Sequence, residues 1–124
     1  MQNLSNRSSD PLFVVVLREF LVARDIEMII RGMAAEARII LARTLDEAIA
    51  AMPQGRIRAA FVQIDPQDFA RSSLGQRVET DGGRPVLVGV EPGDRVPKGW
   101  AELPFPFAES DVAALLALDG CCAR

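Results

Sequence analysis

The fold is decided by residues 12–33, which read LFVVVLREFLVARDIEMIIRGM. Residues 13–17 form a continuous aliphatic and aromatic run that is too short for a helix, and this run predicts a strand buried on both faces. Apolar residues then recur at steps of three and four, which predicts a helix with one apolar face. The members of that face are Leu21, Val22, Ile26, Ile29, Ile30 and Met33. A buried strand followed at once by an amphipathic helix opens a βαβ unit.

Four more strands are predicted further along the chain. They are short apolar runs bounded by Gly, Pro or polar residues, and most neighbours lie far enough apart for a crossover helix between them. The runs span residues 37–42, 59–64, 85–90 and 102–105. Strands that alternate with helices predict right-handed βαβ units, so we expect an α/β fold with a doubly wound, parallel, five-stranded sheet.

The connections between these strands carry different helix signals. Thr44 and Glu47 have the spacing of a capping box, so a second helix is expected from Thr44 onward. A short third helix is expected around residues 68–78, and a last helix over residues 111–118. The segment EPGDRVPKGW, between the fourth and fifth strands, carries two Pro and two Gly residues. The fourth helix is therefore expected to be shortened or missing.

Length and composition fit one domain. The chain has 124 residues, of which 49% are hydrophobic and 25% charged, with a formal net charge of −3. We expect a polar tail at residues 1–11, the domain at residues 12–118 and a C-terminal tail at residues 119–124. The sequence has no long apolar run and no secretory signal pattern, so a cytoplasmic location without a membrane partner is expected. Scattered basic residues and an acidic balance argue against a nucleic-acid partner.

Cysteine and histidine are scarce. Cys121 and Cys122 are the two cysteines of the chain, and the sequence contains no histidine. Adjacent cysteines rarely close a disulfide because the ring is strained, and a metal site built on Cys and His is not expected. We interpret the pair as part of the C-terminal tail, with a redox or lipid-bearing role as the alternative.

Three motifs, in order along the chain, resemble the receiver domain of bacterial two-component response regulators. They are LREFLVARDIEMII at residues 17–30, ARTLDEAIAAM at residues 42–52 and LPFPF at residues 103–107. The resemblance covers residues 12–118 and implies a flavodoxin-like, receiver-like fold.

The resemblance also implies a phosphorylation site whose residues have all changed. Receivers place at their strand ends an acidic pair that holds magnesium, a phosphoacceptor aspartate, a Thr or Ser, and a lysine. The corresponding positions hold Leu17 and Arg18, then Gln63, Val90 and Phe105. An amide cannot form an acyl phosphate, and neither a leucine nor an arginine supplies the oxygen ligands that magnesium requires. We therefore expect no catalytic residue, no metal and no cofactor.

Several other side chains are singled out near these strand ends. Arg18 and Asp65 are expected to form an ion pair, with the guanidinium in the space that a metal ion would take. Trp100 and Phe107 are candidates for a protein interface, whereas Phe105 is interpreted as core in preference to interface.

These observations predict a phosphorylation-independent, receiver-like signalling protein that acts by binding another protein in a bacterial two-component-type pathway. The expected partner is a histidine kinase, a phosphotransferase, another receiver or a second copy of the chain. Two alternatives stay open: a sensor of a small anion or metabolite held by Arg18, and a homodimeric structural module. An enzyme is not expected, because the sequence offers no histidine, no Gly-rich phosphate loop and no hydroxyl nucleophile with an evident base.

Overall fold

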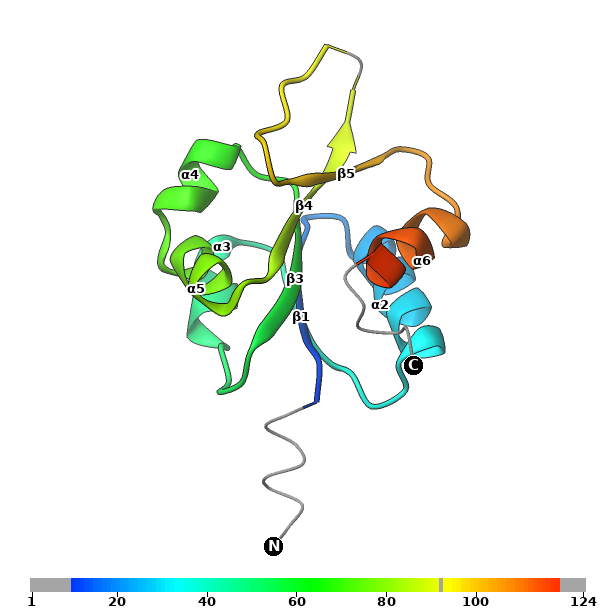
Figure 1. Cartoon of the computed structure of the whole chain (residues 1–124), viewed down its shortest axis with the longest axis horizontal. Coiled ribbons are helices and arrows are strands. Elements are labelled where there is room, and N and C mark those ends of the chain that lie inside the picture. The colour runs from blue at the N-terminus through cyan, green and yellow to red at the C-terminus, as the bar shows by residue number, and fades with distance from the viewer. Residues whose placement is uncertain (1–9, 92, 119–124) are drawn as a thin grey trace, which may run out of the picture.

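The computed structural model describes residues 10–91 and 93–118 (Figure 1). Most of the expected N-terminal tail and the whole C-terminal tail, with Cys121 and Cys122, lie outside these residues. Within them, no helix is both long enough and apolar enough to span a bilayer.

Five parallel strands form one sheet in the order β2-β1-β3-β4-β5. They are β1 (Leu12–Val16), β2 (Arg38–Ala42), β3 (Ile57–Val62), β4 (Arg84–Val90) and β5 (Ala101–Pro104). This order and the helices around the sheet confirm the predicted doubly wound, flavodoxin-like α/β fold. The strand bounds differ from the predicted ones by one or two residues at most ends.

Helices cover both faces of the sheet (Figure 1). On one face lie α2 (Phe20–Met33) and α6 (Glu109–Leu118), and on the other lie α3 (Leu45–Ala50), α4 (Pro66–Arg71) and α5 (Ser73–Asp81). All five residues of β1 are buried, and they alternate between the two layers: Phe13 and Val15 pack on the α2 side, Leu12 and Val14 on the other. The expectation of a first strand buried on both faces is therefore confirmed.

The apolar face of the first helix differs from the predicted one. Ala23, Ile26 and Ile30 are its buried residues, whereas Leu21 is 76% exposed. Leu21 precedes Ile26 by five residues, which places it about 140° away around the helix axis. The prediction that Leu21 belongs to the core face is therefore wrong.

The predicted third helix is in fact two helices, α4 and α5, that meet at Ser72. The hydroxyl of Ser72 donates to the carbonyl oxygen of Phe69 at 2.6 Å and accepts the amide of Gly75 at 3.0 Å, so it ends one helix and caps the next. A Cβ at Gly75 would lie 2.0 Å from the carbonyl oxygen of Phe69. The close approach of the two helices therefore requires glycine at this position.

The second helix begins as its capping box predicts. The Thr44 hydroxyl accepts the amide of Glu47 at 3.2 Å. The Glu47 carboxylate reaches back to the amide of Arg43 at 2.9 Å, one residue earlier than a capping box requires.

The connection between β4 and β5 contains no helix in its described residues, 91 and 93–100, as its Pro and Gly content predicts. Trp100, at its end, packs edge-on against Phe69 of α4, with ring centroids 5.5 Å apart. Trp100 thus packs against the core layer that also contains Phe69, on the α4 side of the sheet.

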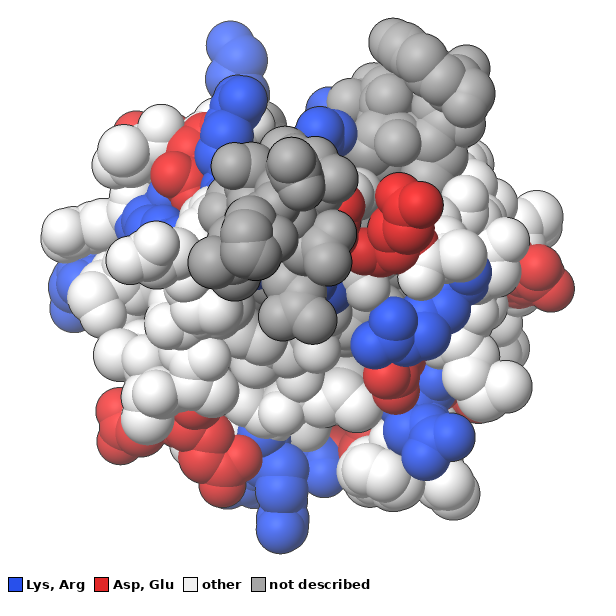
Figure 2. Space-filling view, turned by 90° about the horizontal axis from the view of Figure 1, so that it is seen from below, with Lys and Arg blue, Asp and Glu red and all other residues white. Residues whose placement is uncertain are grey.

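At the edge where the strands begin, charged side chains connect α5 to the start of β3 and to the loop before it. Asp81 accepts the amide of Ile57 at 2.9 Å and pairs with Arg77 at 3.2 Å, and Arg77 also donates to the carbonyl oxygens of Pro53 and Gly55. Figure 2 views the molecule from this side, and the visible basic and acidic side chains are interspersed around it. The charges seen here do not gather into a patch of one sign.

Candidate functional site

The structure brings four of the predicted site positions to one edge of the sheet. The amide of Leu17 donates to the carbonyl oxygen of Ala42 at 3.0 Å, and the amide of Gln63 donates to that of Val16 at 3.3 Å. Leu17 and Gln63 therefore continue directly from β1 and β3. Val90 is the last residue of β4, and Phe105 follows β5.

These residues differ in exposure, although they share one edge. Leu17 is buried in the core on the α2 side, Val90 is half-buried, and Arg18 and Gln63 are exposed. Phe105 is 42% exposed, so its interpretation as core is wrong. At this edge, the residue after β1 is buried in the core, whereas the residues after β3 and β5 are exposed to solvent.

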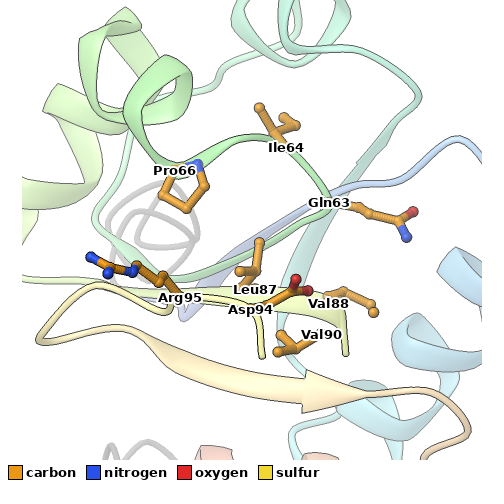
Figure 3. Close-up of a pocket in the computed structure, with 9 residues that line it drawn as sticks. Gln63, Ile64, Pro66, Leu87, Val88, Val90, Asp94 and Arg95 are labelled. Carbon is orange, nitrogen blue, oxygen red and sulfur yellow. The ribbon is translucent and has the colours of Figure 1, made fainter. Parts of the chain in front are cut away.

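A hollow of about 330 Å³ lies beside the ends of β3 and β4 (Figure 3). Most of its lining residues are apolar, and its polar side chains are those of Gln63, Asp94 and Arg95. The side chains of Gln63 and Arg95 extend in opposite directions in Figure 3. The Asp94 carboxylate accepts the amide of Glu91 at 2.9 Å within its own loop. The polar groups therefore do not converge on a common point, as recognition of a small ligand requires.

The predicted ion pair between Arg18 and Asp65 is not formed in the part of the chain that the structure describes. The Asp65 carboxylate instead accepts the amides of Gln67 at 2.8 Å and Asp68 at 3.3 Å. It is the N-cap of α4, whose first residue is Pro66. The carboxylate that was expected to hold Arg18 therefore stabilises a helix start.

Gly89 brings Gln63 and Phe105 close together above the end of β4. It lies where the register between β4 and β5 shifts, and its φ is +80°. A Cβ at this position would lie 2.7 Å from Nε2 of Gln63 and 3.1 Å from Cε2 of Phe105. The absence of a side chain at Gly89 therefore allows the Phe105 ring to lie where it does.

Two further hollows lie between α2 and the connection from β5 to α6. The two have volumes of about 430 and 400 Å³, and Asp25 and Phe107 line both. We call them together the α2 groove. Its lining residues are Glu19, Val22, Asp25, Met28, Ile29, Phe105, Pro106, Phe107 and Glu109.

Exposed apolar side chains concentrate in and beside the α2 groove. Of the five large hydrophobic residues that are exposed among those described, Met28 (62%) and Phe105 (42%) line the groove. Leu21 (76%) lies two turns before Met28 on the same face of α2, and Phe20 (57%) precedes it. Ile49 (37%) is the fifth and lies in α3, on the other side of the sheet.

The two predicted interface residues lie apart. Phe107 is half-buried in the α2 groove, with its ring centroid 6.0 Å from that of Phe105. Trp100 is half-buried on the opposite side of the sheet, against Phe69. The sequence analysis assigned Leu21 to the core face and did not single out Met28. The signal of a separate apolar stripe was their spacing of seven residues, which places them on one side of the helix.

Within residues 10–91 and 93–118, no three His, Cys, Asp or Glu side chains are placed to hold a metal ion. No model of a protein family matches the chain, and a search of curated proteins finds no significant match. The order of the strands places the chain in the doubly wound, flavodoxin-like class of α/β folds, and its first helix carries an open groove lined mostly by apolar residues.

Proposed function

We propose that this chain is a receiver-like signalling module that binds another protein through the α2 groove, without being phosphorylated. The observation that carries the proposal is the exposure of Leu21, Met28 and Phe105 in and beside one groove. Burying one such side chain contributes about 1.5–3 kcal/mol. Contiguous exposed apolar surface of this kind is typical of interaction sites.

Independence from phosphorylation is supported by the strand ends. Gln63 stands where the resemblance to receivers expects the phosphoacceptor, and an amide forms no acyl phosphate. Leu17, at one of the expected acidic positions, is buried in the core and offers no ligand to a cation. The partner we propose is a protein of a bacterial two-component-type pathway, a histidine kinase, a phosphotransferase or another receiver.

The alternative function, a sensor of a small anion or metabolite, has weaker support. Arg18 lacks the expected carboxylate partner, and the polar groups of the hollow beside β3 and β4 point apart. The other alternative, a homodimeric module, would place the same acidic side chains of two copies against each other if the α2 groove were the interface.

Treatment with acetyl phosphate tests the phosphorylation-independent part of this proposal. The chain incubated with magnesium and acetyl phosphate is expected to show no mass gain of one phosphoryl group, because Gln63 replaces the acceptor. Intact-protein mass spectrometry measures this directly, with a receiver that keeps its aspartate as the positive control. A stoichiometric phosphoryl adduct on the chain would refute the proposal.

A further inference from the structure

The α2 groove combines an apolar floor with acidic side chains. Glu19, Asp25 and Glu109 are exposed at its lining, and no Lys or Arg lines it. None of these three carboxylates forms an ion pair with any residue in the described part of the chain. By contrast, Glu27, on the same helix but outside the groove, pairs with Arg24 at 3.6 Å and with Arg31 at 3.3 Å. The groove therefore presents negative charge that no ion pair with a residue of the described ranges neutralises.

The α2 groove runs along α2. Its lining residues on this side run from Glu19, the N-cap of α2, to Ile29 within the helix, a span of about 15 Å at the rise of an α-helix. The opposite wall is the connection from β5 to α6, where Phe105 and Phe107 project. A groove of this length, with apolar residues along one wall, matches about three turns of an incoming helix laid along α2.

We propose that the α2 groove takes an amphipathic helix of the partner protein whose apolar face is flanked by Lys or Arg; this inference rests on the proposed function. The apolar face covers Met28 and Phe105, and the flanking basic residues pair with Asp25, Glu109 and Glu19. Because these carboxylates have no partner within the described chain, pairing them breaks no existing ion pair. Charge complementarity thus sets which helix binds, and apolar burial supplies most of the affinity.

The same charges disfavour other occupants. A second copy of the chain would bring its own three carboxylates against those of the first, and like charges facing each other oppose association. An anionic lipid surface would be repelled in the same way, because it attracts basic rather than acidic segments. The unpaired acidic side chains therefore favour a basic partner helix over self-association.

The test is a titration of the ¹⁵N-labelled chain, followed by NMR, with two designed helical peptides of about 18 residues. Both carry the same leucine face; one is flanked by lysine and the other by glutamate. The lysine peptide is expected to shift amide signals in α2 and in residues 105–109. It is expected to bind at least about tenfold more tightly than the glutamate peptide, a difference that decreases as salt is added.

Matched variants separate site-specific pairing from attraction by overall charge. Asp25→Asn with Glu109→Gln removes two carboxylates of the groove, and Asp46→Asn with Glu79→Gln removes two exposed ones on the opposite side of the sheet. Each pair includes one acidic residue in the first turn of a helix. The first variant is expected to weaken binding of the lysine peptide by about tenfold, and the second by less than about twofold.

The outcomes distinguish the inference from the function on which it rests. If both peptides bind equally well at the α2 groove, charge selection is refuted and the docking surface stands. Equal weakening by the two double variants would also refute selection by the groove. If the lysine peptide binds elsewhere and Met28→Gln leaves its affinity unchanged, both the inference and the proposed groove fail. A groove-mediated dimer of the unliganded chain, seen by sedimentation, would show a second copy as the occupant and overturn the inference.

Discussion

Replacing both Met28 and Phe105 by glutamine is expected to weaken binding of the protein partner by about 10- to 100-fold. Met28 is 62% exposed and Phe105 42% exposed in the free chain, and both line the α2 groove, so the substitutions remove apolar surface that becomes buried in the complex. Complete burial of one such side chain contributes about 1.5–3 kcal/mol, so burial of the exposed part contributes about half of this for each residue, and about 1.4 kcal/mol corresponds to a tenfold change in affinity. Isothermal titration with the isolated partner measures the loss.

The control for this experiment is Ile49→Gln. Ile49 is an exposed apolar residue in α3, on the other side of the sheet, so its replacement removes apolar surface outside the groove. Its affinity for the partner is expected to match that of the unmodified chain. Thermal unfolding of all variants should be similar, because none of the replaced side chains is buried. A double variant that folds and binds at full affinity would eliminate the groove as the docking site.

Gly89→Ala is expected to reduce both stability and partner binding. A residue with a Cβ at φ of +80° costs about 1–2 kcal/mol of folding free energy. The added Cβ also meets Cε2 of Phe105 at 3.1 Å and Nε2 of Gln63 at 2.7 Å. The flexible Gln63 amide can move away, whereas a shift of the Phe105 ring changes the wall of the α2 groove. We therefore expect affinity for the partner to fall by about tenfold, as for loss of one interface side chain.

Gly99→Ala separates the backbone effect from the displacement of Phe105. Gly99 has a φ of +91°, and a Cβ there would meet no atom within 4 Å. This variant is expected to lose similar stability in urea denaturation but to bind the partner as tightly as the unmodified chain. Equal affinities for the Gly89 and Gly99 variants would contradict a role for Gly89 in positioning Phe105.

The architecture of the sheet could be predicted from the sequence because its signals are local and repeated. Short apolar runs such as residues 13–17 are typical of strands buried on both faces, as in a parallel sheet, and the Thr44 capping signal marked a helix start. The break at Ser72 was missed because Gly75 stands three residues after it, where a capping box would have Glu or Gln. The helical pattern therefore predicted one continuous helix where two exist.

The candidate site was less predictable, for two different reasons. Asp65 carried a readable signal, since an Asp before a Pro is typical of a helix start, yet it was assigned to an ion pair with Arg18. The exposure of Phe105 carried no local signal. It depends on the register shift at Gly89 and on the distance between α2 and the chain after β5, which only the assembled fold sets.

The measurement that tests the docking surface most directly is photo-cross-linking inside the native cell. A photoreactive phenylalanine analogue is placed at position 28 in one strain and at position 49 in another. Irradiation is expected to join the chain covalently to one discrete protein from position 28 and to give no such product from position 49. A cross-link that forms from position 49 and not from position 28 would contradict the account, because the partner would then lie against α3 and away from the α2 groove.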